Sequence, residues 1–231
     1  PRGPFDNPAP RPPLAALLEH KYMRLNDKVA VITGAGSGIG RATAESFVSE
    51  GAAVVASDWN AATLEEVVGS LRATGGRIVG VHGNVALRAD AEAMVDRAVG
   101  DFGRIAVLVN NAGAMDYNHG VGSVPDDIWE RLLGINLTGP MFTSRRAVQH
   151  MLSSGGGAIV NVVSAAGASG AVAGAAYTSA KHGLLGLTRS TAWMYARQGI
   201  RCNAILPGGV STASVADGRA EVGSRRNRTG P

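Results

Sequence analysis

The stretch Lys28-Val29-Ala30-Val31-Ile32-Thr33-Gly34-Ala35-Gly36-Ser37-Gly38-Ile39-Gly40 decides the fold of this chain. Residues 28–33 form a short apolar run rich in β-branched side chains, which predicts a buried strand. Four glycines follow within seven residues, and the segment 41–50 is then typical of a helix. Glycines let the backbone approach a ligand closely, and a helix N-terminus offers unpaired N–H groups and the positive end of its dipole. The stretch therefore predicts a pyrophosphate-binding loop, although a glycine-rich turn without a ligand has the same composition.

Strand-like and helix-like stretches alternate from Lys28 to Leu206. This alternation predicts an α/β fold of the Rossmann type, a doubly wound parallel sheet with helices on both faces. Right-handed crossovers would place the motifs that follow the strands at one edge of that sheet. We expect a single NAD-binding domain at residues 23–213. A proline-rich extension at 1–22, expected to be disordered, precedes it, and an Arg- and Gly-rich tail at 214–231 follows it.

Asp58 follows a second apolar run, residues 53–57, and lies eighteen residues past Gly40. A carboxylate at the end of the second strand can accept hydrogen bonds from the adenosine ribose hydroxyls, and it would repel a 2′-phosphate. The glycine loop carries Ser37 but no basic residue, and we expect Arg41, just beyond it, to face solvent. These residues favour NAD over NADP.

Tyr177 and Lys181 are four residues apart, so they share one face of a predicted helix. A free phenol ionises near pH ~10, and a neighbouring ammonium group lowers that pKa. Ser164, thirteen residues earlier, supplies a hydroxyl that could hold the reacting oxygen. Together the three residues predict a general acid/base site. The spacing alone is weak evidence, because a Tyr and a Lys one helical turn apart are common surface neighbours.

In combination these motifs resemble the short-chain dehydrogenase/reductase family in its single-domain form, over roughly residues 25–212. The residues that carry the resemblance occur in the family's order: Thr33, Gly34, Gly38 and Gly40 in the glycine loop, Asn110-Asn111-Ala112-Gly113, Asn136, Ser164, Tyr177 with Lys181, and Pro207-Gly208.

The resemblance implies a catalytic tetrad of Asn136, Ser164, Tyr177 and Lys181. Tyr177 would donate a proton to a carbonyl oxygen during reduction, or remove the hydroxyl proton during oxidation. Lys181 would lower the pKa of the tyrosine and bind the nicotinamide ribose. Ser164 would polarise the substrate oxygen, and Asn136 would anchor a water that relays protons from Lys181. The implied NAD contacts are Gly34, Ser37, Gly38, Ile39, Gly40, Asp58, Asn84, Val85, Asn110, Asn111, Ala112, Gly113, Tyr177, Lys181, Pro207, Gly208, Val210 and Thr212.

The chain departs from the family pattern at two places. The family usually has Asp before Val where the adenine amino group binds, whereas this chain has Asn84-Val85. An amide oxygen can still accept that bond, so we expect a weaker adenine contact. Family members also continue well past the Pro-Gly turn, whereas only twenty-three residues follow Gly208, with no strand-like run among them. We expect the native end to have been replaced and the C-terminal substrate lid and last strand to be missing.

Composition argues against several other function classes. The two end segments carry +3 of the formal net charge of +4, so the predicted domain has no basic stripe for nucleic acid. No apolar run reaches the ~18 residues of a membrane span, and the five histidines lack metal-ligand spacing. With Cys202 as the single cysteine and no visible export signal, we expect a cytoplasmic protein.

The favoured function is an NAD-dependent oxidoreductase that interconverts a secondary alcohol and a ketone. Small side chains at 165–174 leave room for a bulky or ring-bearing substrate, and Asp116, Tyr117 and His119 could touch the substrate or serve the loop alone. One alternative is a 3-oxoacyl-thioester reductase of the same family, against which Asp58 argues. Another is a dinucleotide-binding protein that is inactive without its lid. Family members usually pair through two long helices, here roughly 126–152 and 175–197, so we expect a homodimer or homotetramer.

Overall fold

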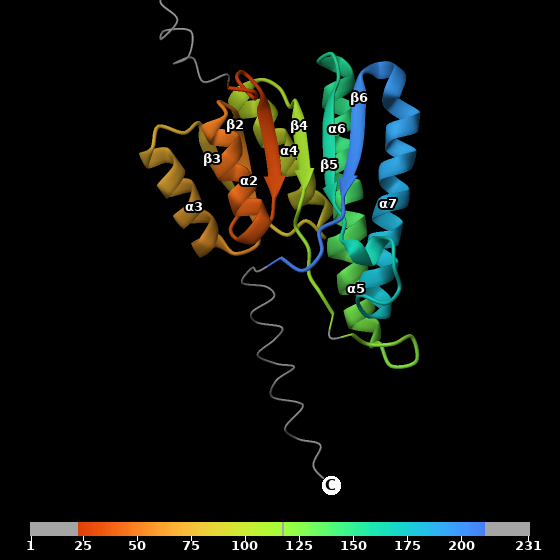
Figure 1. Ribbon diagram of the computed structural model, residues 1–231. Coiled ribbons are helices and arrows are strands. Elements are labelled where there is room, and N and C mark those ends of the chain that lie inside the picture. The colour runs from red at the N-terminus through yellow and green to blue at the C-terminus, as the bar shows by residue number, and fades with distance from the viewer. Residues whose placement is uncertain (1–22, 117, 211–231) are drawn as a thin grey trace, which may run out of the picture.

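The computed structural model describes residues 23–116 and 118–210, and within them six strands form one sheet (Figure 1). The strands lie in the order β3-β2-β1-β4-β5-β6, and every neighbouring pair is parallel. Their bounds are β1 Val29–Thr33, β2 Ala53–Asp58, β3 Ile78–His82, β4 Val107–Asn110, β5 Gly157–Val162 and β6 Ile200–Ile205. The order reverses between β1 and β4, which makes this the switch point where ligands bind in such sheets. The predicted Rossmann-type fold is confirmed.

Helices cover both faces of the sheet. Their bounds are α2 Gly38–Ser49, α3 Ala61–Ala73, α4 Arg88–Phe102, α5 Asp126–Leu133, α6 Gly139–Ser153 and α7 Ala175–Tyr195. One core layer joins the sheet to α4, α6 and α7, and the other joins it to α2 and α3. Because both faces of β1 and β2 are covered, all eleven residues of these two strands are buried.

A π-helical segment, η1 (Gly134–Thr138), joins α5 to α6 where the sequence predicted one uninterrupted helix. Pro140 has no backbone N–H, so the carbonyl of Asn136 could not receive the usual helical hydrogen bond four residues on. In the π-helical turn the Gly139 N–H donates instead to the Gly134 carbonyl, five residues back. Residue 136 therefore lies at a local widening of the helix, and its side chain is fully buried.

Two large apolar side chains at the β6 edge of the sheet are partly exposed. Ile205 and Leu206, at the end of β6, are 46% and 40% exposed. The predicted segments 1–22 and 214–231, and the predicted loss of the lid and last strand, fall outside the described residues. Among the helices in the described ranges, none combines the length and apolarity required to cross a membrane.

Candidate active site

The carboxyl ends of the strands bring the predicted motifs to one edge of the sheet, the edge to which the arrowheads point in Figure 1. The glycine loop follows β1 and Asp58 ends β2. Asn110 ends β4, while Ser164 lies two residues past β5 and Pro207 two residues past β6. Segments that are far apart in the sequence therefore meet around the switch point.

In the glycine loop, residues 34–40, the backbone lies so close to neighbouring atoms that side chains have no room at several positions. Gly34 and Gly38 have φ values of +66° and +52°, which favour glycine. A Cβ atom at Gly36 would meet the Thr63 hydroxyl oxygen at 2.5 Å, and one at Gly40 would collide with the Gly34 carbonyl oxygen. Ser37 caps α2 without a side-chain hydrogen bond. The first N–H groups of α2 are therefore not satisfied by a capping side chain, as a phosphate-binding helix requires.

Asp58 is buried at the end of β2, where its two carboxylate oxygens accept backbone hydrogen bonds. The Gly36 N–H donates to one oxygen at 2.9 Å, and the Asn60 N–H donates to the other at 2.9 Å. Arg41, expected to face solvent, is half-buried and forms ion pairs with Glu45 at 3.0 Å and Glu66 at 2.9 Å. This guanidinium is thus engaged by two carboxylates. The Asp58 carboxylate contacts the glycine loop directly, through the Gly36 N–H.

Thr33 and Asn111 hold the glycine loop against the segment after β4. The Asn111 side-chain amide donates to the carbonyls of Thr33 and Gly34, at 2.9 and 3.0 Å. The Thr33 hydroxyl oxygen accepts the N–H groups of Asn111 and Ala112, both at 3.0 Å. These four bonds fix the relative position of two segments that the sequence predicts to bind one ligand.

Asn110, grouped with the NAD contacts in the sequence analysis, points its side chain elsewhere. It is 2% exposed and donates to Asn161 at 2.8 Å and to Ser144 at 3.0 Å, while its oxygen accepts from Thr143 at 2.6 Å. Asn161 continues this buried chain to Thr188 of α7 at 2.8 Å. A cofactor contact from Asn110 could therefore come only from its main chain, and its side chain instead ties α6 to the centre of the sheet.

The remaining predicted cofactor contacts lie at the same edge with less support. The Asn84 side-chain oxygen already accepts the Ala86 N–H at 3.0 Å, while Val85 is buried. The Pro207 carbonyl accepts the Ala165 N–H at 2.9 Å, which places the Pro-Gly turn beside the segment that carries Ser164. Gly208 and Val210 are exposed. Thr212 falls outside the described residues.

Tyr177 and Ser164 are brought together as predicted. Burial raises the pKa of the Tyr177 phenol, a hydrogen bond with Ser164 opposes that rise, and the negative charge of Asp116 adds to it. Ser164 has φ +154° and ψ 162°, a backbone conformation usual for glycine, and its hydroxyl oxygen also accepts the Ala166 N–H at 3.2 Å. The constrained backbone directs this hydroxyl towards the start of α7.

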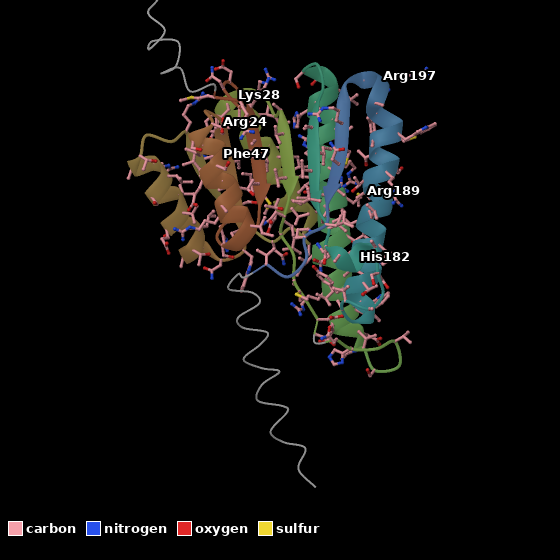
Figure 2. The ribbon with its side chains drawn as sticks, in the orientation of Figure 1. Arg24, Lys28, Phe47, His182, Arg189 and Arg197 are labelled. Atoms are coloured by element: carbon pink, nitrogen blue, oxygen red, sulfur yellow. The ribbon has the colours of Figure 1, made fainter. Side chains whose placement is uncertain are left out.

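Lys181 lies beside Tyr177, as the four-residue spacing of the two residues predicts. Its Nζ donates to the Val162 carbonyl at 3.0 Å and lies 5.4 Å from the centroid of the Tyr177 ring. The net direction of the Tyr177 pKa is a rise, because the effect of burial is the largest. Burial lowers the pKa of Lys181 itself to about 8. His182 and Arg189 on the exposed side of α7, and Arg197 in the short helical turn η3 (Ala196–Gln198) that follows it, point away from the sheet (Figure 2).

Asn136 anchors the segment after β4 to the η1 turn. Its Nδ2 donates to the carbonyls of Ala114 at 2.8 Å and Leu132 at 3.0 Å, and its Oδ1 accepts the Ala114 N–H at 3.3 Å. A Cβ atom at Gly113 would lie 3.0 Å from that Oδ1 and 3.6 Å from the Lys181 Nζ. The missing side chain of Gly113 thus leaves room between Asn136 and Lys181, where a proton-relaying water is predicted by the family resemblance.

Two features of the site were not predicted from the sequence. The η1 turn could have been suspected from Pro140, which removes a helical N–H donor four residues after Asn136. Asp116, left open between a substrate and a loop role, is 8% exposed and contacts the backbone at the start of α7. Across residues 23–116 and 118–210, no group of three or more His, Cys, Asp and Glu side chains gathers in a way that could hold a metal ion.

Comparison with known proteins agrees with this geometry. The short chain dehydrogenase family profile matches residues 28–223. The chain is 42% identical to 3beta-hydroxysteroid dehydrogenase 2 of Eggerthella lenta over 189 residues, which cover 81% of this chain and 73% of the relative. It is 39% identical to cyclohexanol dehydrogenase of an Acinetobacter species over 194 residues, which cover 84% and 77% of the two chains.

A solved structure gives the same result for the fold. The crystal structure of levodione reductase superposes with a TM-score of 0.84 at 34% identity, covering 89% of this chain and 80% of that one. The profile match spans well over half of the chain, and it includes the glycine loop, Asn136, Ser164, Tyr177 and Lys181. The chain belongs to the short chain dehydrogenase family and is an oxidoreductase that acts on CH–OH groups.

Proposed function

We propose that this protein is an NAD-dependent dehydrogenase that interconverts a secondary alcohol and a ketone, with Tyr177 as the general acid and base. The observation that carries the proposal is the meeting of Tyr177, Ser164 and Lys181 at the sheet edge that also holds the glycine loop. A nicotinamide dinucleotide, when bound, supplies or accepts the hydride. The protein's own groups then have to bind, orient and exchange a proton.

In this proposal Tyr177 is the group that exchanges a proton with the substrate. In the direction of reduction, its phenol donates a proton to the carbonyl oxygen; in the direction of oxidation, the phenolate removes the proton of the hydroxyl group. The Ser164 hydroxyl, already in contact with the phenol, holds the same oxygen. A phenol is protonated at neutral pH, and the raised pKa of Tyr177 strengthens that preference, which suits reduction. Oxidation should therefore gain as the pH rises.

Lys181 and Asn136 complete the proton path. The ammonium group of Lys181 lies under the ring of Tyr177 and is held by the Val162 carbonyl. With a pKa of about 8, it can gain or lose a proton close to neutral pH. The space beside Gly113, between Asn136 and Lys181, is suited to a water that would carry that proton onward.

Three features of the glycine loop support a dinucleotide and favour NAD. Side chains at Gly36 or Gly40 would fill the space that the backbone uses, so the loop is shaped for close approach to a ligand. Asp58 places a carboxylate against the loop, where it can accept hydrogen bonds from ribose hydroxyls and repel a 2′-phosphate. Arg41, a cation just past the loop, forms ion pairs with Glu45 and Glu66.

Ring-bearing alcohols are the substrates we propose. Two relatives are named for such compounds, cyclohexanol and a 3beta-hydroxysteroid. Residues 165–174 next to Ser164 are nearly all Ala, Gly and Ser, so they leave room for a ring. The expected homodimer or homotetramer and the cytoplasmic location stay predictions from the sequence.

The test is a parallel titration of the protein with NADH and NADPH, followed by nicotinamide fluorescence, on wild type and on Asp58→Ala. We expect wild type to bind NADH at least about tenfold more tightly than NADPH, a difference of ~1.4 kcal/mol. Asp58→Ala should reduce or reverse that preference. Asp101→Asn, which removes an equal charge from the last turn of α4, is the matched control and should leave the preference unchanged.

Oxidation of cyclohexanol by NAD, followed by NADH absorbance, then tests the reaction. Equal binding of the two cofactors would contradict the proposed NAD preference and leave the reaction class intact. Tight NADH binding without oxidation of any ring-bearing secondary alcohol would contradict the proposed substrate class.

A further inference from the structure

The N-terminus of α7, the helix that carries Tyr177, receives its hydrogen-bond acceptors from a distant loop. The capping residue is Gly174, no side chain of the helix caps its own start, and the first turn has no acidic residue. The first N–H groups of a helix have no partner within the helix. Here the Asp116 carboxylate accepts two of them: the Gly174 N–H donates to it at 3.2 Å, and the Tyr177 N–H donates to it at 3.4 Å. The Ala175 N–H donates to the His119 carbonyl at 2.8 Å.

The approach of Asp116 to α7 depends on glycine at position 174. A Cβ atom there would collide with the Asp116 carboxylate oxygen and would lie 2.7 Å from the His119 nitrogen. Asp116 is 8% exposed, although it carries a charge. A carboxylate at that depth needs hydrogen bonds, and the positive end of the α7 dipole is a favourable place for it. The position, burial and hydrogen-bond partners of Asp116 therefore fit a carboxylate that binds the start of α7.

We propose that Asp116 is a positioning residue for Tyr177: its carboxylate fastens the loop after β4 to the start of α7, where its negative charge disfavours ionisation of the phenol. The proposal rests on the proposed function, because it assigns the regulation of the same acid/base group. A single side chain would then hold the backbone of Tyr177 in place and contribute, together with burial, to the raised pKa of its phenol.

The charges around the phenol support this assignment. Asp116 comes from the loop after β4, and Lys181 comes from α7 itself with its Nζ held by the Val162 carbonyl. The helix α5, which packs against α7, carries Asp126, Asp127, Glu130 and Arg131 at exposed positions, and η1 and η2 (Ala165–Gly167) contain no charged residue. A nearby carboxylate disfavours the phenolate. Asp116 acts in this direction, adding to the larger effect of burial on the pKa of Tyr177.

The experiment reads the protonation of Tyr177 directly and needs no substrate. Protein labelled with ¹³C at the phenolic carbon of tyrosine is titrated with base and followed by NMR, for wild type, Asp116→Asn and the control Asp127→Asn. The chain has four tyrosines, and the resonance that is absent from Tyr177→Phe identifies Tyr177. Asp116→Asn keeps the shape and one acceptor oxygen but removes the charge. Asp127→Asn removes an equal charge from the exposed start of α5.

We expect the midpoint of the Tyr177 titration to fall by about half a pH unit or more in Asp116→Asn and to stay in place in Asp127→Asn. The rise with pH of cyclohexanol oxidation should move to lower pH by the same amount. An unchanged midpoint in a folded Asp116→Asn protein would overturn the proposal, as would an equal fall in both variants. Because the NMR readout does not depend on turnover, a lack of cyclohexanol oxidation would count against the proposed function and not against the role of Asp116.

Discussion

The glycine loop and the Tyr177–Lys181 pair lie at the same edge of the sheet but are built in different ways. The loop, residues 34–40, is made of backbone, and its shape follows from positive φ angles and from contacts too close for a Cβ atom. The Tyr177 site is made of side chains that reach it from three segments: the turn after β5, the helix α7 and the loop after β4. One half of the site is therefore fixed by sterics and the other by burial and charge.

This difference determines what substitutions should do in each half. In the glycine loop an added methyl group has no room, so a small change should abolish binding without altering any charge. Around Tyr177 the packing tolerates exchange of one side chain for another of similar size, whereas the protonation state responds to each charge. Binding and proton transfer should thus be separable by mutation.

Gly40→Ala should have the largest effect on the binding half. The new Cβ atom would collide with the Gly34 carbonyl oxygen and lie 2.5 Å from the Asn111 side-chain nitrogen, so the backbone has to shift. We expect NADH affinity, measured by fluorescence titration, to fall at least about a hundredfold, the equivalent of ~2.8 kcal/mol.

The matched control for this variant is Gly69→Ala in α3, where an added Cβ atom meets nothing within 4 Å. It should leave NADH affinity unchanged and stabilise the helix by about 0.5–1 kcal/mol, because alanine is the better helix former. If Gly40→Ala bound NADH as well as Gly69→Ala does, the loop would not be the cofactor cradle.

Lys181→Met should make the protein more stable. This effect should be smaller than the loss of NADH affinity in Gly40→Ala. Lys181 is 3% exposed, and burial lowers its pKa from 10.5 to about 8, so its charge destabilises the folded protein by about 3 kcal/mol at neutral pH. Methionine removes that charge and also the bond to the Val162 carbonyl, which offsets about 1 kcal/mol. We expect the free energy of unfolding at pH 7 to rise by about 1–2 kcal/mol while turnover is lost.

The gain in stability of Lys181→Met depends on pH, because Lys181 has a lower pKa in the folded protein than in the unfolded chain. Between pH 8 and 10.5 the unfolded chain holds the lysine proton more strongly than the folded protein, so wild type gains stability as the pH rises through this window. The advantage of Lys181→Met should therefore be constant below pH 8 and shrink above it. Denaturant unfolding at pH 7 and pH 10 measures this. A variant less stable than wild type at both pH values would show that the buried ammonium group stabilises the fold.

The fold and the binding half of the site could be predicted from the sequence because their determinants are local. The run Val29–Thr33 is apolar throughout, and the glycines that follow it can adopt a loop that other residues cannot. Parallel crossovers then bring Asp58 and Asn111 to the loop without any knowledge of side-chain packing. In the same way, the four-residue spacing of Tyr177 and Lys181 placed both on one face of α7.

The electrostatics of the catalytic half could not be predicted in this way, because they depend on contacts between segments far apart in the sequence. The spacing indicated that Lys181 would lower the pKa of Tyr177, but it did not show that its Nζ is held by the Val162 carbonyl. Nor could it show that Asp116, sixty-one residues before Tyr177, contacts the start of α7. For the same reason the sequence did not show that the Asn110 side chain donates to Ser144 and Asn161, which belong to other elements.

The most direct test of the account compares Tyr177→Phe with wild type in two assays, NADH binding by fluorescence and cyclohexanol oxidation by NADH absorbance. The substitution keeps the ring and removes only the hydroxyl group. Because general acid/base catalysis contributes about 10²–10⁴-fold to a rate, we predict that turnover falls by about a thousandfold while NADH affinity changes by less than about threefold. Turnover that survives the substitution unchanged would contradict the assignment of Tyr177 as the group that carries the proton.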